Sequence, residues 1–169
     1  MELLMSDYII KNIIDVKDEL PNSSSVLLWV WHADKIPPHI GLSLENQYFS
    51  LKANGKDFQL PVDNVFDLLA KKKITTLCFV LNNDIDLNSV LTEFKSYDQT
   101  IPFKVTCLNP IKNLLKCSEA NKLIDLLEEL ERNNEVGSVF GFNVSDAFSG
   151  IKNYSTDDIH SRLTKLYND

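Results

Sequence analysis

A short and wholly apolar run occurs twice in this chain of 169 residues, and it constrains the fold more than any other feature. Residues 26–31 read Val-Leu-Leu-Trp-Val-Trp, and residues 75–81 read Thr-Thr-Leu-Cys-Phe-Val-Leu. A strand with one face in water alternates apolar and polar residues, whereas a strand buried on both faces does not. Both runs therefore predict central strands of a sheet that is covered on both faces.

A β-hairpin is predicted directly after the first run. The dipeptide Pro37-Pro38 favours extended backbone over residues 39–44, and after the polar turn Glu45-Asn46 the chain returns over residues 47–53. The dipeptide Asn54-Gly55 marks a further tight turn. An antiparallel sheet is therefore expected around the first run.

The remaining elements are predicted from apolar spacing and from capping residues. Helices are expected over residues 7–20, after Asp63, after Asp86 or Asn88, over residues 110–116, after Ser118 and after Ser155, and strands over residues 101–106 and 139–144. We find no repeat, linker or low-complexity segment. The sequence thus predicts a single domain over residues 1–169, of the α+β class, with helices packed on an antiparallel sheet.

The net charge of the chain limits the classes of partner that it can bind. It has 24 acidic and 17 basic residues, and a net charge of −7 repels nucleic acid and anionic lipid alike. No run approaches the roughly 18 apolar residues that a membrane helix requires, and residues 1–7 lack the positive charge of a signal peptide. We expect a cytoplasmic protein that binds neither nucleic acid nor membrane, and the sequence identifies no protein partner.

Cofactor and metal motifs are not found in the sequence. It has no phosphate-cradling glycine loop, no dinucleotide fingerprint and no metal-binding spacing, so neither a cofactor nor a metal is predicted. Its three cysteines are odd in number and form no Cys-x-x-Cys pair. We therefore expect three free thiols.

One of these thiols is the best candidate for a nucleophile. Cys78 lies inside the second apolar run, where a small buried hydrophobic residue is expected, and Cys117 ends a predicted helix. Cys107 approaches the start of a helix, whose partial positive charge favours a thiolate. An inert cysteine at the junction of two elements remains an equal alternative.

The three histidines differ in their surroundings. His160 falls on the terminal helix and is expected to face solvent, and His32 follows the first apolar run at its exit. His39 opens the predicted hairpin. Because a catalytic thiol needs an imidazole that takes its proton, His39 is the histidine of most interest.

Residues 39–51, His-Ile-Gly-Leu-Ser-Leu-Glu-Asn-Gln-Tyr-Phe-Ser-Leu, resemble a hairpin of the papain-like NlpC-type hydrolases and the lecithin-retinol acyltransferase group. That hairpin reads His-x-Gly-φ-x-φ-Gly-Asn-Gly-x-φ-φ-His, where φ is apolar, and residues 26–31 resemble the strand that precedes it. The resemblance implies that His39 is the catalytic base. In circularly permuted members the cysteine follows the hairpin at a helix start, which implies Cys107 as nucleophile.

The resemblance has two departures. Glu45-Asn46-Gln47 replaces the glycine-rich turn, and Leu51 occupies the position of the final polar residue. Ser50 or Lys52, on either side of Leu51, is the neighbouring polar residue, although a shift of one residue on a strand turns a side chain to the opposite face.

Three hypotheses follow. The first is a permuted papain-like thiol hydrolase or acyltransferase that acts on an amide, peptide or ester, with a small molecule or peptide as substrate and with Cys107, His39 and Ser50 at its site. The second is a non-catalytic interaction or scaffold domain, on the same fold with its active site lost, which Leu51 favours. The third is a small-ligand binding protein that uses the aromatic side chains Trp29, Trp31 and Tyr48.

Overall fold

A seven-stranded sheet organises the protein in a computed structural model that describes residues 6–168. Residues 1–5, within the segment where no signal peptide is predicted, lie outside the described residues. In spatial order the strands are β2 (Ile14–Asp15), β8 (Val136–Phe142), β7 (Thr76–Leu81), β3 (Val26–Trp31), β4 (His39–Leu44), β5 (Gln47–Lys52) and β6 (Gly55–Pro61). All neighbours are antiparallel except β2 and β8. The predicted α+β class with an antiparallel sheet is confirmed.

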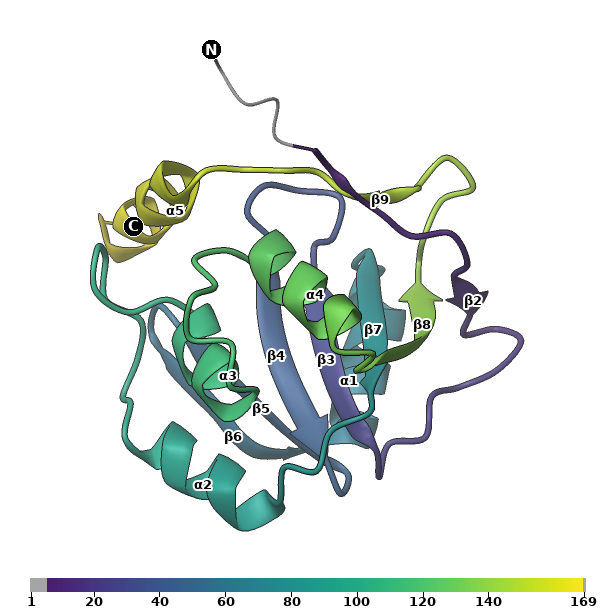
Figure 1. Ribbon diagram of the computed structural model, residues 1–169, viewed down its shortest axis with the longest axis horizontal. Helices are drawn as coiled ribbons and strands as arrows, with labels where there is room; N and C mark the ends of the chain where they lie inside the picture. The colour runs from purple at the N-terminus through teal and green to yellow at the C-terminus, as the bar shows by residue number, and fades with distance from the viewer. Residues whose placement is uncertain (1–5, 169) are drawn as a thin grey trace.

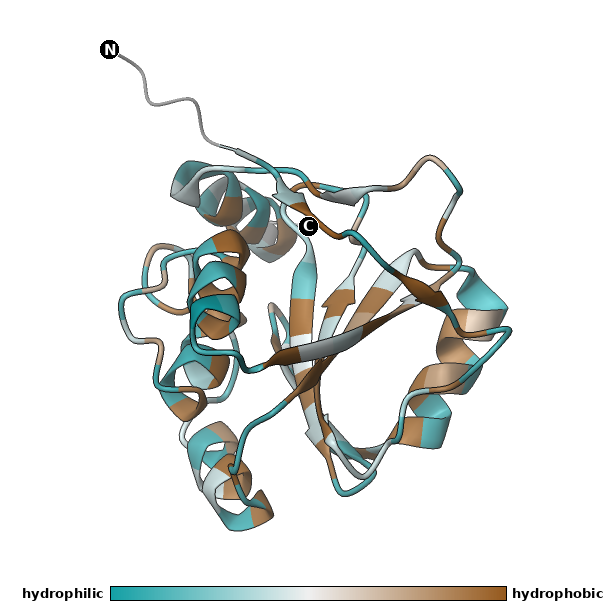
Figure 2. Ribbon diagram, turned by 45° about the vertical axis from the view of Figure 1, so that its right-hand side comes forward, coloured by the Kyte–Doolittle hydropathy of each residue, from teal (hydrophilic) through white to brown (hydrophobic). Residues whose placement is uncertain are grey.

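Helices cover both faces of this sheet (Figure 1). They are α1 (Val62–Lys72), α2 (Leu87–Lys95), α3 (Leu108–Leu114), α4 (Leu123–Arg132) and α5 (Thr156–Asn168). In Figure 2, α1 lies on one side of the sheet, and α2, α3 and α4 lie on the other. β3 and β7 are central and covered on both faces, as the two apolar runs predict. No helix within residues 6–168 is long and apolar enough to cross a membrane.

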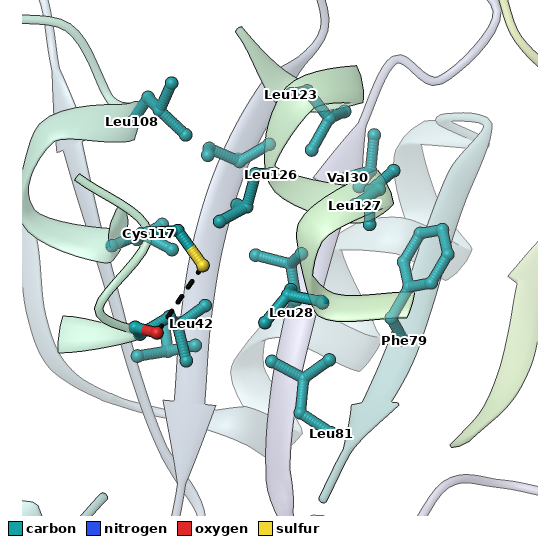
Figure 3. Packing of buried hydrophobic residues seen from close by; sticks show 14 of the residues in the cluster. Leu28, Val30, Leu42, Phe79, Leu81, Leu108, Cys117, Leu123, Leu126 and Leu127 are labelled. Carbon is teal, nitrogen blue, oxygen red and sulfur yellow. Dashed lines mark hydrogen bonds between the residues drawn. The ribbon is translucent and has the colours of Figure 1, made fainter. Parts of the chain in front are cut away.

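The side chains of β3 alternate between two cores. Leu28 and Val30 pack with the helices α3 and α4, and Figure 3 shows them beside Leu127 of α4. Trp29 and Trp31 point to the other face and pack in a second cluster that includes residues of α1. Full burial of such a side chain stabilises the fold by about 1.5–3 kcal/mol. The side chains of β3 therefore stabilise the packing on both faces of the sheet.

The helix predicted over residues 7–20 is wrong, because this segment pairs with strands instead. Tyr8–Ile9 forms β1, which pairs with β9 (Gly150–Ile151) in a small second sheet, and Ile14 of β2 lies opposite Phe140 of β8. Isoleucine is β-branched, which restricts it in a helix and suits it to a pleated surface. The pairing partners lie near the other end of the chain, so local spacing alone does not reveal them.

The strand predicted over residues 101–106 is also wrong. Ile101 and Val105 exchange backbone hydrogen bonds of 2.8 Å across a tight turn, in which Phe103 has a φ of 64°. The segment finds no strand partner beyond this bridge within the described residues. Pro102 cannot donate to a ladder, which is why the alternating pattern here folds back on itself.

Several helix boundaries follow their capping residues. The Asp86 side chain accepts a 2.7 Å hydrogen bond from the backbone N–H of Ser89, which confirms the start predicted for α2. Before α5, Ser155 and Asp158 cap one another as predicted. By contrast, α4 begins at Leu123, later than the start predicted after Ser118.

Candidate functional site

A cavity of about 620 Å³ lies at the end of the sheet where β3 passes into β4. The loop between these strands, the end of β5, the turn before α3 and one side of α5 contribute to its walls. His39 and Cys107, which the sequence pattern singles out as base and nucleophile, both line it. The fold therefore brings two distant segments of the chain to one cavity.

His39 is the first residue of β4. It lies opposite Trp31 in the sheet register, so its side chain projects on the face that α1 covers. The imidazole Nε2 is buried and has no hydrogen-bond partner among the described residues. Burial lowers the pKa of His39 to about 4, and the charge of Asp57 only partly opposes this. His39 is therefore neutral at pH 7.

Cys107 immediately precedes α3 and is half-buried. It packs against the hydrophobic cluster beneath α3 and α4, which contains Ile40. Hydrogen bonding from the Ile40 backbone acts to lower the pKa of the Cys107 thiol, but it is the smaller of two opposing effects. Burial has the larger effect and raises the pKa of the thiol above its ordinary value. The predicted thiolate is thus corrected, because loss of water around the sulfur outweighs the backbone donors.

His39 and Cys107 reach the cavity from different sides of the sheet. His39 shares a face with Trp31, whereas Cys107 packs with the side chains of the opposite face. Since β4 pairs with β5 only from Leu42 onward, the strands are not hydrogen-bonded to each other at residues 39–41. The cavity lies where this pairing has ended. Because the pKa of His39 is lowered and that of Cys107 is raised, both side chains are neutral at pH 7.

Ser50, which is predicted as the third polar residue of the site, lies in a different place from the one expected. It is fully buried on β5, and its hydroxyl donates a 2.9 Å hydrogen bond to Asp57 Oδ2. Asp57 Oδ1 lies 3.0 Å from Lys52 Nζ, and its negative charge raises the pKa of His39. Ser50 therefore hydrogen-bonds a carboxylate whose charge acts on His39.

Asp57 is not among the residues predicted from the sequence, although a local signal for it exists. The turn at Asn54-Gly55 sets the register of β5 against β6, which places Asp57 opposite Ser50. Asp57 is identified when the predicted hairpin is extended by the strand that follows this turn.

The aromatic side chains of the third hypothesis are mainly structural. Trp29 and Tyr48 are no more than 1% exposed, and their rings meet edge to face at 6.0 Å. Trp29 Nε1 donates to Ser43 Oγ at 2.7 Å, and Trp31 Nε1 donates to the Tyr48 hydroxyl at 2.7 Å. Of the three aromatic residues, Trp31 lines the cavity.

Thr100 is a second polar residue of the cavity with an unmet hydrogen bond. Its side chain is 1% exposed, and its Oγ1 has no partner among the described residues. Leaving a buried polar group unpaired costs about 1–3 kcal/mol. Thr100 Oγ1 and His39 Nε2 are therefore two buried polar atoms with unmet hydrogen bonds, on residues that line this cavity. No local pattern in the sequence indicates Thr100.

No family model, curated protein or solved structure matches the chain. Within the described residues, no group of three His, Cys, Asp or Glu side chains is arranged to hold a metal ion. The candidate site consequently rests on the geometry of this chain.

Proposed function

We propose that the protein is a thiol hydrolase or acyltransferase that acts on an amide, peptide or ester. Cys107 is the nucleophile and His39 is the base. The observation that supports this function is that both residues line one cavity, in which the imidazole Nε2 has no partner among the described residues.

The neutral state of both groups selects a general-base mechanism. Cys107 Sγ bonds to the substrate carbonyl carbon while a ring nitrogen of His39 takes the thiol proton, and the carbonyl π electrons move onto oxygen. The carbonyl then re-forms, the C–N or C–O bond breaks, and His39 passes the proton to the leaving amine or alcohol. This leaves a thioester on Cys107.

The second half of the reaction releases the acyl group. Water, or a second alcohol or amine, adds to the thioester carbon while His39 takes its proton. The C–S bond breaks, and the proton returns from His39 to the Cys107 sulfur. Water gives hydrolysis, and the other acceptors give acyl transfer.

A non-catalytic binding domain is the second candidate. The specific observation in its favour is the raised pKa of Cys107, together with Leu51 at the position where the resembling families carry a polar residue. Leu51 is fully buried and lines the cavity, where it adds apolar surface. Such a domain would bind a ligand at the same place without cleaving it.

Acylation by p-nitrophenyl acetate distinguishes the two functions. We expect an acetyl adduct on Cys107 by mass spectrometry, since Cys78 and Cys117 are no more than 1% exposed. His39→Gln should lower the acylation rate by about 10²–10⁴, the usual contribution of a general base. Cys117→Ser is the matched control and should keep the rate of the unaltered protein.

Circular dichroism establishes that each variant is folded before its rate is compared. Acylation of Cys107 at the rate of an ordinary thiol, with no response to His39→Gln, would contradict the enzyme and support the binding domain.

A further inference from the structure

The charges around the cavity differ in sign from the charge of the whole chain. The described residues that line it include four cationic side chains and no aspartate or glutamate, whereas the chain carries a net charge of −7. The four are Lys35, Lys52, Lys122 and Arg162. A cavity lined by one sign of charge attracts ligands of the opposite sign.

Two of these cations are available to a ligand. Lys52 Nζ is 3.0 Å from Asp57, and Lys122 Nζ donates to Asn153 at 2.9 Å. Within residues 6–168, neither Lys35 nor Arg162 forms an ion pair with a carboxylate.

Lys35 and Arg162 line the cavity from separate elements. Lys35 lies in the loop between β3 and β4, Arg162 lies on α5, and both side chains are exposed. Burial lowers the pKa of His32, and the charges of Lys35 and Arg162 lower it further, whereas the charge of Asp34 acts to raise it. Both cations therefore influence His32, which also lines the cavity.

The interior of the cavity is apolar with few polar positions. Leu51, Leu123 and Leu163 are at most 8% exposed. Beside them lie the two unpaired buried atoms, Thr100 Oγ1 and His39 Nε2. The apolar lining together with the cations suits a molecule with an apolar body and an anionic group.

We propose that this cavity binds an amphipathic organic anion whose carboxylate or phosphate lies between Lys35 and Arg162. Its apolar body contacts the leucines, and its amide or ester group lies near Cys107. Arginine pairs with either oxyanion through two parallel hydrogen bonds, and lysine adds a point charge. This ligand class is also the substrate class of the proposed thiol chemistry. Cleavage of the bound anion rests on the proposed function, whereas its binding does not.

Titration calorimetry with three simple probes tests the charge requirement. Octanoate, octyl phosphate and octanol share an apolar chain and differ in the headgroup. We expect either anion or both to bind about tenfold or more tightly than octanol, because charged hydrogen bonds are the stronger ones. Trp31, which lines the cavity, supplies a fluorescence readout of the same event.

The variant Lys35→Gln/Arg162→Gln should weaken binding of the anion about tenfold and leave octanol unchanged. Lys165→Gln is the matched control, since Lys165 is an exposed lysine of α5 outside the lining of the cavity. Both variants change exposed side chains, so the fold should persist, and circular dichroism verifies this.

Each outcome decides the proposal. Binding of one anion alone identifies carboxylate or phosphate as the source of the oxyanion. Failure of both anions to bind, equal binding of octanol, unchanged binding by the double variant or an equal loss in Lys165→Gln overturns the proposal.

Cys107→Ala separates this proposal from the enzymatic function. If anions bind to Cys107→Ala and to the unaltered protein, yet Cys107 is not acylated, the anion site stands and the enzyme falls. If acylation of Cys107 depends on His39 but neither anion binds better than octanol, the enzyme stands and the anion site falls.

Discussion

Substitution of Gly41 by alanine tests the packing of β4 against Tyr48. Gly41 lies on β4 opposite Trp29, and a Cβ built there overlaps the ring and the hydroxyl of Tyr48, with Tyr48 Cε2 at 2.6 Å. Tyr48 is 1% exposed and accepts the hydrogen bond from Trp31, so the ring has no free space to enter. The added methyl group must therefore displace a buried, hydrogen-bonded side chain.

The magnitude follows from two contributions. Overpacking a filled core costs about 1–3 kcal/mol, and losing a net hydrogen bond costs about 0.5–1.5 kcal/mol. We expect Gly41→Ala to lower the free energy of unfolding by about 2–4 kcal/mol. For a chain of this size that is a fall in Tm of about 5–15 °C.

Urea unfolding followed by circular dichroism measures this change. Gly137→Ala on β8 is the matched control, because its added Cβ meets only Val80, with the backbone oxygen at 3.1 Å, and should cost less. A loss below 1 kcal/mol for Gly41→Ala, or a loss equal to that of the control, would refute the reasoning about Tyr48.

Two further predictions concern the histidines. Because the pKa of folded His39 is lowered to about 4, the unfolded chain binds a proton first as the pH falls, so stability should decrease from about pH 6.5 to pH 4. His39→Gln should remove this part of the pH dependence in urea titrations, and an unchanged profile would contradict the burial of the imidazole. His160 Nδ1 accepts the backbone N–H of Phe103 at 3.0 Å, and the two rings stack at 4.7 Å. His160→Ala should therefore speed hydrogen exchange in α5 while the exchange of β3 stays constant, and equal acceleration of both would show a global effect instead.

The central strands could be predicted from the sequence because their signal is local. The apolar runs of β3 and β7 have no polar face, so they can only occupy the middle of a covered sheet. Ile9 and Ile14 carry no such signal. Their strands depend on partners near the other end of the chain, and helical spacing over residues 7–20 arises without a helix.

The candidate site could be predicted only in part, for a related reason. His39 and Cys107 were identified by pattern, but the pKa of a thiol depends on how much water surrounds it in the folded protein. Arg162 comes to the cavity through the placement of α5, and Thr100 through the turn that follows it. Neither placement is encoded by the spacing of neighbouring residues. His160 shows the same limit, since it contacts Phe103 rather than facing solvent freely.

Packing explains the glycine of the His-x-Gly pattern but does not explain the histidine. Gly41 is required because the Tyr48 ring occupies the space of a side chain, whatever the function of the protein. His39 has no equivalent packing reason, since an apolar residue would fill its place without leaving a buried nitrogen unpaired. A resemblance based on the glycine alone therefore does not indicate catalysis, and the unpaired imidazole nitrogen is the observation on which the proposed function depends. This is why the acylation experiment changes His39, and why substitutions at Gly41 address stability only.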